Sequence, residues 1–287
     1  MKIYLAGGVT GNLIYFWKEA MKLYLAGTYS RPFVIQESMK LYLAGITLFG
    51  KDTYTNSIIE NKPYILESFY YIKNQNDWIM KMRPFFEDFL LDSGAFSFLN
   101  NIKKGTPNWD KYIEDYAAFI TKHDIDLFFE LDIDPIVGIT EVERLRTKLE
   151  GLTGKKCIPV WHKSRGLEYW KQMCKDYNYI AIGGIVTKEI KSKDYNIFSP
   201  LLKIAKENKC NVHGLGFTKM EGMKKYPFYS VDSTAWLYGN RGGFLYQFTG
   251  KGISKIHFKG KRLIGRPAAI HNFNEWVKFS KYSERHL

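Results

Sequence analysis

Four aspartates stand at the ends of short apolar segments of this 287-residue sequence: Asp92, Asp132, Asp134 and Asp232. Two carboxylates that share a site can divide the work of a reaction, because one can act as a nucleophile while the other transfers a proton. An aspartate that follows a strand is, on its own, commonly a helix cap or a turn former. The chemical interpretation therefore depends on whether the fold gathers these carboxylates.

Histidines and glycines occupy equivalent positions at the ends of other apolar segments. They are His162, Gly183, Gly184, His213 and Gly214. A lone histidine in such a place is commonly a hydrogen-bonded structural residue, and a Gly-Gly pair is commonly a turn. Their shared position at segment ends, together with the aspartates, favours a site over a set of unrelated turns.

The elements that must position these residues follow the order strand then helix. Strands are predicted over 1–7, 21–27, 39–45, 89–93, 126–132, 157–162, 179–184, 211–216 and 228–232, and helices over 109–122, 140–152, 166–177 and 200–208. Continuous apolar strands that alternate with amphipathic helices are typical of a parallel sheet covered by helices. We predict an α/β fold, a (β/α)8 TIM-barrel-like single domain over 1–287, with a doubly wound open sheet as the alternative. The nine strand candidates are one more than the eight strands of such a barrel, so one of them is surplus.

The first three strand candidates are copies of one motif, MK[IL]YLAG, within residues 1–45. About a dozen residues separate the copies, which is enough for a short crossover helix between parallel strands. The copies are therefore either successive barrel strands or a local duplication outside the core. The period ends at Gly45, which excludes a solenoid.

The composition points to a polyanionic partner. Lys and Arg number 42 against 29 Asp and Glu, a formal charge of +13, and residues 233–274 contain no acidic residue. A basic, hairpin-like segment is predicted over 244–266, and its aromatic residues could stack on unpaired bases while its cations meet phosphates. The cations in question are Arg241, Lys251, Lys255, Lys259, Lys261, Arg262 and Arg266. A solvated Lys-rich face over an ordinary hairpin is the alternative.

Several classes of protein are disfavoured. No apolar run is long enough to span a membrane, so no membrane partner is expected, and the sequence begins without the order of a signal peptide. Cys157, Cys174 and Cys210 are scattered and odd in number, which suggests no disulfide framework and fits a reducing cytoplasm.

The strand ends also resemble the motifs of a known family. DSGAF (92–96), YIAIGGI (179–185), HGLG (213–216) and SVDSTAWLYGNRGG (230–243) are similar, in order, to motifs of the tRNA-guanine transglycosylase superfamily. The resemblance covers about half of the chain. It implies a (β/α)8 enzyme that replaces guanine with a 7-deazaguanine through a covalent intermediate.

The resemblance also implies roles for individual residues. Asp232 matches the nucleophile, and Asp92 matches the aspartate that holds the base and handles its proton. In the base pocket, Phe96 matches the ring stacked on the base, and His213 (beside Gly214) takes the place of the apolar residue on the other side. Gly183 and Gly184 match the backbone that contacts the purine. Asp132 is the best match to the aspartate that reads the purine edge, with Asp134 as its rival. The family's glutamine has no counterpart, although Trp161 or His162 stands near its place.

Two departures from the family bear on the substrate. The tRNA-modifying members carry a zinc site with a CxCxxC motif, whereas the three cysteines here are too far apart, so we predict no zinc and no cofactor. No RNA-binding appendage is recognisable after the barrel. The sequence is therefore closer in character to the DNA 7-deazaguanine transglycosylases of bacteriophages and bacterial modification islands.

On this interpretation the partners are DNA and a free 7-deazaguanine base similar to preQ0, in the cytoplasm of a bacterium or a phage-infected host. The alternatives are a tRNA-guanine transglycosylase and a non-catalytic barrel that binds nucleic acid. The oligomeric state is left open.

Overall fold

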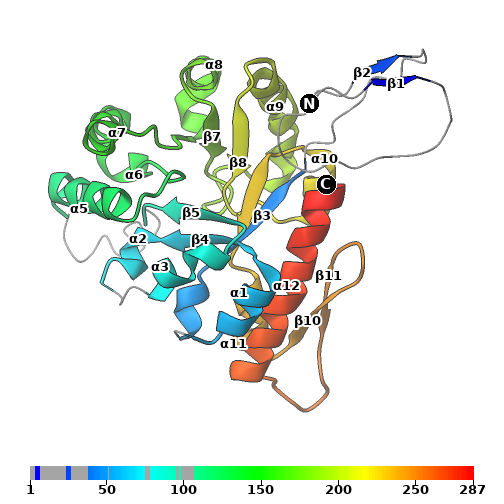
Figure 1. Ribbon diagram of the computed structural model, residues 1–287. Coiled ribbons are helices and arrows are strands. Elements are labelled where there is room, and N and C mark those ends of the chain that lie inside the picture. The colour runs from blue at the N-terminus through cyan, green and yellow to red at the C-terminus, as the bar shows by residue number, and fades with distance from the viewer. Residues whose placement is uncertain are drawn as a thin grey trace. The chain divides into compact units, whose positions relative to one another are not determined.

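A computed structural model describes residues 4–6, 24–26, 38–50, 52–74, 78–94, 97 and 107–287. The chain divides into two compact units, Met1–Gln36 and Glu37–Leu287. In the first unit, strands β1 (Tyr4–Ala6) and β2 (Tyr24–Ala26) pair in parallel, so the first two copies of the repeated motif pair with each other. The barrel lies in the second unit (Figure 1). That residues 1–36 belong to one domain with the barrel stays a prediction from the sequence.

Seven parallel strands curl into the barrel of the second unit. In sheet order they are β5 (Asp88–Asp92), β4 (Tyr64–Ser68), β3 (Lys40–Ala44), β9 (Ser230–Ser233), β8 (Asn211–Gly214), β7 (Tyr179–Ile182) and β6 (Val160–Trp161). Phe128 forms a parallel bridge with Leu91 of β5, and Phe129 forms one with Ile158, two residues before β6. The segment at Phe128 and Phe129 therefore joins the two edges of the sheet. This confirms the predicted α/β, TIM-barrel-like fold.

The strand predictions differ from the structure at three places. The third copy of the motif is β3, whereas the first two copies lie in the other unit. The segment 126–132 forms isolated bridges instead of a ladder. Strand β4 was not predicted: its sequence, YILES, places a charged residue, Glu67, at a position that is 1% exposed. The carboxylate of Glu67 accepts hydrogen bonds from Thr47 N and Oγ1, a tertiary contact that no periodicity reveals.

The four predicted helices are all present, to within two residues at each end. The helices are α1 (Thr55–Asn61), α2 (Phe69–Ile72), α3 (Trp78–Met82), α5 (Trp109–Lys122), α6 (Asp134–Val137), α7 (Ile139–Thr153), α8 (Gly166–Asp176), α9 (Phe198–Glu207), α10 (Met220–Lys225), α11 (Trp236–Gly242) and α12 (Arg266–His286). Helix α5 shows why prediction succeeded: the Asn108 side chain caps Lys111 N at 3.0 Å, and the apolar residues recur at helical spacing on the buried face. Among the described residues, no helix combines the length and apolarity that a membrane span requires.

Helix α12 packs against the barrel's first strand. The Ser280 hydroxyl donates to the carbonyl of Leu41 in β3 at 2.7 Å, and Tyr64 of β4 donates to Glu284. Inside the ring, a separate apolar cluster that includes Tyr42, Leu90, Phe129 and Val160 fills the space between the strands. This cluster forms the floor beneath the carboxyl ends of the strands, where a TIM barrel places its active site.

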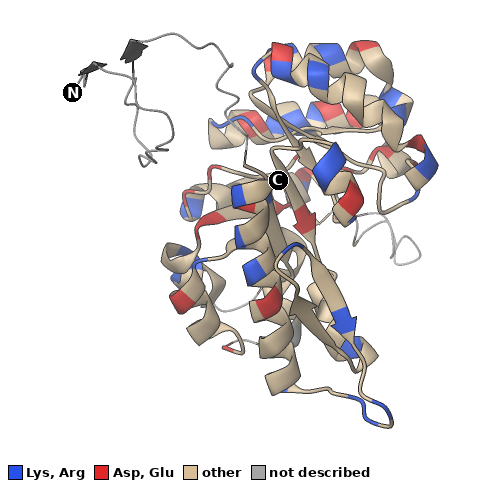
Figure 2. Cartoon of the chain, turned by 90° about the vertical axis from the view of Figure 1, so that its right-hand side faces the viewer, with Lys and Arg blue, Asp and Glu red and all other residues tan. Residues whose placement is uncertain are grey.

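Strands β10 (Leu245–Phe248) and β11 (Ile253–Ile256) pair antiparallel and form the hairpin of the basic segment. Figure 2 shows Lys and Arg along this hairpin and the loop that follows it. Two of its aromatic residues do not face solvent: Phe244 and Tyr246 are 7% and 4% exposed, and Tyr246 contacts Trp276 of α12. The expected interleaving of cations with stacking rings is therefore wrong for these two residues, while Phe258 is exposed.

Candidate functional site

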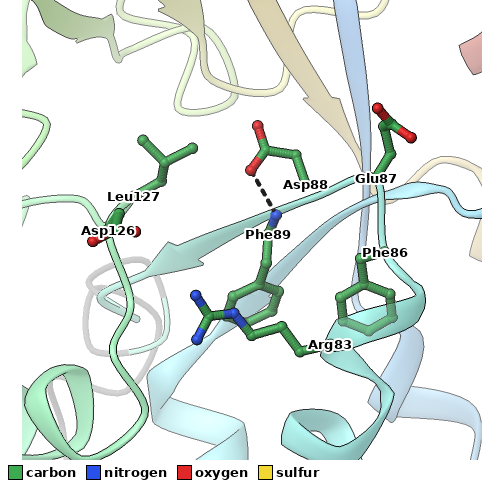
Figure 3. Close-up of a pocket in the computed structure, with 7 residues that line it drawn as sticks. All are labelled: Arg83, Phe86, Glu87, Asp88, Phe89, Asp126 and Leu127. Carbon is green, nitrogen blue, oxygen red and sulfur yellow. Dashed lines mark hydrogen bonds between the residues drawn. The ribbon is translucent and has the colours of Figure 1, made fainter.

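A cavity of about 900 Å³ opens at the carboxyl ends of the barrel strands. It is lined by six of the residues that the sequence placed in a site: Asp92, Asp132, His162, Gly183, Gly184 and Asp232. Asp92 and Asp232 come from β5 and β9, and the other four lie in segments that follow strands or bridges, so the fold gathers residues that are up to 140 positions apart in the chain. A smaller cavity, of about 200 Å³, lies at the amino end of β5 around Asp88 and Arg83 (Figure 3). In TIM barrels that end serves stability.

Asp92 ends β5, and its carboxylate accepts a hydrogen bond from Gly94 N at 3.0 Å. Burial raises the pKa of Asp92 to about 6, and the negative charges of Asp232 and Asp132 contribute to the increase. The hydrogen bonds from Ser68 and Gly94 oppose it. Such a group can give up a proton and take it back near neutral pH. Asp92 is therefore suited to general acid and base chemistry.

Asp232 lies in β9, which β4 and β3 separate from β5 in the sheet, and one oxygen of its carboxylate is held by two donors. Gly216 N lies 2.7 Å from Oδ1 of Asp232, and Nε2 of His213 lies 3.2 Å from the same oxygen. Both contacts fall on Oδ1, which leaves Oδ2 outside them. The carboxylate is thus oriented by the protein while keeping one oxygen for a reaction.

His213 occupies a different place from the one expected. It is fully buried inside the ring, its Nδ1 lies 2.6 Å from Ser230 Oγ, and it does not line the cavity. The pairing of β8 with β9 sets His213 opposite Ser230, one layer below Asp232. The prediction that its ring flanks a bound base is therefore corrected: His213 supports Asp232 from beneath. Gly214 is buried against Phe217 and Phe228 and is likewise outside the lining.

His162 is held between two carboxylates on the cavity wall. Its Nε2 lies 2.7 Å from Asp132 Oδ1, and its Nδ1 lies 2.8 Å from Glu189 Oε2. Burial alone would lower the pKa of His162, but the hydrogen bonds and charges of Asp132 and Glu189 raise it to about 9. The ring is therefore an imidazolium at neutral pH. Glu189 was missed by sequence reasoning, because it lies in an irregular loop five residues after Gly184 with no motif of its own.

Gly183 and Gly184 leave room for this pair of side chains. A Cβ on Gly183 would lie 2.8 Å from Cε1 of His162, and a Cβ on Gly184 would lie 2.7 Å from Oε2 of Glu189. Gly184 also has φ +80°, which side chains rarely adopt. The Gly-Gly pair thus allows His162 and Glu189 to approach the backbone after β7, in addition to lining the cavity.

We expect Gly183→Ala to destabilise the protein by about 1–3 kcal/mol, because the new methyl group overpacks a buried site. Urea unfolding followed by circular dichroism measures this. Gly151→Ala is the matched control: it lies in α7 with no atom within 4 Å of the added Cβ, so its stability should be unchanged or higher. Equal midpoints for Gly183→Ala and the wild type would show that the His162 ring has no need of the glycine.

Asp134, the rival of Asp132, is committed elsewhere. Its two oxygens accept hydrogen bonds from Arg165 at 2.6 and 2.7 Å, and Arg165 also contacts the buried Glu130. Asp132 lines the cavity and Asp134 does not, so of the two aspartates only Asp132 is placed where it could contact a ligand in the cavity. Phe96 lies outside the described residues.

Only one of the predicted nucleic-acid-binding cations reaches the cavity. Arg241 on α11 lines its rim beside Tyr238, which is 55% exposed and has the Arg241 guanidinium 5.9 Å from its ring centre. The other six do not line the cavity: Lys251, Lys255, Lys259, Lys261, Arg262 and Arg266 are exposed on the hairpin, on the loop after it and at the start of α12.

The fold and the carboxylate-lined mouth define a TIM barrel of the kind that enzymes use. No family model matches the chain, and no curated protein matches it. Among solved structures, it is similar to a protein described as a fructose-1,6-biphosphate aldolase from Coccidioides immitis, with 10% identity, a TM-score of 0.55, and coverage of 87% of this chain and 90% of that one.

Two further similarities have lower TM-scores. The carboxyl transferase domain of Rhizobium etli pyruvate carboxylase gives 0.46 at 13% identity over 87% of this chain, which spans about half (48%) of that one. Thiamine phosphate pyrophosphorylase from Bacteroides thetaiotaomicron gives 0.41 at 8% identity, over 86% of this chain and 100% of that one. At such identities the similarity to the aldolase establishes the fold and leaves the chemistry to the site.

Proposed function

We propose that this protein is a base-exchange transglycosylase that replaces guanine in DNA with a 7-deazaguanine through a covalent intermediate on Asp232. The observation that supports this most is the pair Asp92 and Asp232 in one cavity with different surroundings. Burial favours the protonated form of Asp92, whereas two hydrogen-bond donors orient Asp232. A pair of carboxylates with separate tasks is what a retaining exchange at C1′ needs.

The proposed first step forms one bond and breaks another. Oδ2 of Asp232 attacks C1′ of the nucleotide as the bond from C1′ to N9 of guanine breaks. The proton of Asp92 passes to the departing base, which leaves as neutral guanine. The products are a sugar ester on Asp232 and an ionised Asp92.

The second step reverses these events with another base. The incoming 7-deazaguanine gives its N9 proton to Asp92, and its N9 attacks C1′ as the ester bond to Asp232 breaks. Both aspartates return to their starting forms, so the exchange needs no external proton or oxidant. To present C1′, the nucleotide must leave its stack, which costs a few kcal/mol.

DNA is proposed as the polymer on two grounds. The acid-free run 233–274 begins one residue after Asp232, and Arg241 at the cavity rim continues into the exposed cations of the hairpin. This supports a phosphate path from the cavity along the surface. The spacing of Cys157, Cys174 and Cys210 differs from the zinc motif of the tRNA-modifying members, which favours DNA over tRNA.

The proposal is tested by incubating the protein with duplex DNA, or with tRNA, and a free 7-deazaguanine, and then analysing the nucleosides by mass spectrometry. Incorporation of the deazaguanine into DNA is expected. Incorporation into tRNA alone would establish the second candidate, a tRNA-guanine transglycosylase. Binding of nucleic acid with no exchange for any deazaguanine would overturn the enzymatic proposal in favour of a non-catalytic barrel.

The cations of the basic segment 244–266, including those on the loop after the hairpin, are expected to contribute phosphate contacts. The double variant Lys259→Ala/Lys261→Ala should weaken DNA binding and reduce the slope of log K against log salt by about 0.9 per lost contact. Fluorescence anisotropy at several salt concentrations measures the slope. Lys175→Ala/Lys203→Ala, two exposed lysines on α8 and α9, removes the same charge elsewhere and is expected to leave the slope unchanged. Equal slopes for the two double variants would mean that Lys259 and Lys261 are only solvated.

A further inference from the structure

Glu189, His162 and Asp132 form a continuous chain of hydrogen bonds along the cavity wall. Glu189 is fully committed, because Oε2 contacts His162 Nδ1 and Oε1 accepts a hydrogen bond from Ser164 N at 3.1 Å. His162 is also fully committed, since its second nitrogen contacts Asp132. Asp132 uses only Oδ1 in this chain, so its Oδ2 is the polar end of the array. Neither step of the proposed exchange uses Glu189 or His162.

The array is built as a rigid unit. The His162 side chain is 9% exposed, whereas the side chains of Asp132 and Glu189 are 23% and 30% exposed. Gly183 and Gly184 leave the space in which the ring and the Glu189 carboxylate sit. Two carboxylates around one imidazolium carry a net charge of −1. Because the ring has no freedom to turn without losing both bonds, the direction of the Asp132 carboxylate is fixed by Glu189 through His162.

We infer that Glu189 and His162 are positioning residues that hold Oδ2 of Asp132 toward a purine whose edge carries two adjacent donors. This deepens the proposed function and rests on it. Guanine and 7-deazaguanine present N1–H and an exocyclic amino group on that edge, and a carboxylate accepts from both. Adenine and 7-deazaadenine present an acceptor at the corresponding ring nitrogen, which faces a carboxylate without a proton between them. The array therefore selects the guanine type of base.

A purely structural role for the array makes a different prediction. If His162 and Glu189 only filled the wall, their loss would lower the stability and weaken all bases equally. A positioning role changes the ratio between two bases of the same size. Misplacing a hydrogen-bonding group weakens the interaction that depends on it by on the order of 10–100-fold, so the ratio of the affinities for the two bases is a sensitive measurement.

The test measures the binding of free 7-deazaguanine and free 7-deazaadenine to the full chain by isothermal titration calorimetry. The wild type is expected to prefer 7-deazaguanine. Glu189→Gln, which cannot balance the imidazolium charge, should reduce this preference by about tenfold or more. Glu168→Gln is the matched control, because Glu168 is an exposed residue of α8 whose side chain is 84% exposed, and it should leave the preference unchanged.

His162→Gln is the second variant and is used if Glu189→Gln does not fold. Its glutamine keeps a hydrogen-bonding side chain at this position. An unchanged preference in the folded variants would overturn the inference, and so would a wild type that binds neither base. Because the measurement needs no exchange, its outcome is separate from that of the proposed function. Exchange into DNA with an unchanged base preference in Glu189→Gln would leave the function standing and remove the role of the array.

Discussion

Asp232→Asn is expected to abolish base exchange, with a fall in kcat of about 10⁴-fold or more, while binding of DNA persists. The amide oxygen of asparagine can still accept the hydrogen bond from Gly216 N, so the geometry of the site is retained. An amide is, however, a very poor nucleophile toward C1′. The loss therefore reports on the bond to the sugar and leaves the binding surface intact.

Two measurements separate these effects. Incorporation of labelled guanine into DNA follows the exchange, and anisotropy with the same duplex follows the binding. In addition, wild-type protein mixed with DNA and denatured before an incoming base is added should show a covalent adduct by mass spectrometry, which Asp232→Asn lacks. Asp126→Asn, at an exposed aspartate paired with Lys155, serves as the control. Exchange at the wild-type rate in Asp232→Asn would exclude a covalent intermediate on this residue.

Asp92→Asn is expected to lower the exchange rate by about 10²–10⁴-fold, the usual contribution of a general acid or base. In the wild type the pKa of Asp92 is about 6, so the fraction able to donate a proton falls as the pH rises through 6. The rate of guanine release should fall with it, and Asp92→Asn should lose this pH dependence. Single-turnover release of labelled guanine between pH 5 and 8 measures both. A profile in the variant that matches the wild type would assign the proton to another group.

Asp92→Asn is expected to change the stability of the protein in the opposite direction from its effect on activity. The pKa of Asp92 is raised in the folded state above its ordinary value of 3.8. Its contribution to stability is therefore present in full below about pH 4 and is lost as the pH rises through about 6. At pH 7, Asp92→Asn should be at least as stable as the wild type, because it removes a charge from a buried position. A catalytic defect accompanied by equal or higher stability distinguishes a functional residue from a structural one.

The sequence predicted the fold from the alternation of apolar strands with amphipathic helices, and one further rule, that functional residues follow the carboxyl ends of barrel strands, selected the candidate site residues. The rule selected Asp92, His162 and Asp232, which do share a cavity. It could not assign the layer within the ring. His213 also ends a strand, yet the pairing of β8 with β9 places it under Asp232, a matter of register that alternation along one strand does not determine.

Residues that act through tertiary contacts were beyond reach of the sequence. Glu189 has no motif and gains its place only when its loop folds back onto His162. The Gly-Gly pair was interpreted through the family resemblance, whereas its close approach to two side chains from separate loops is visible only in three dimensions. In the same way, the sequence predicts that Phe244 and Tyr246 are available to bases, whereas both are buried and Tyr246 contacts Trp276 of α12.

The packing of α12 has a consequence for the synthesis of this protein. Its residues Ser280 and Glu284 bond to β3 and β4, which lie more than 200 positions earlier in the chain. Because chains emerge from the ribosome at about 5–20 residues per second, β3 and β4 wait at least about ten seconds for the helix that covers them. During translation the face of β3 and β4 that α12 covers stays exposed until the helix has emerged, and a message cut short before Arg266 yields a polypeptide in which that face remains uncovered.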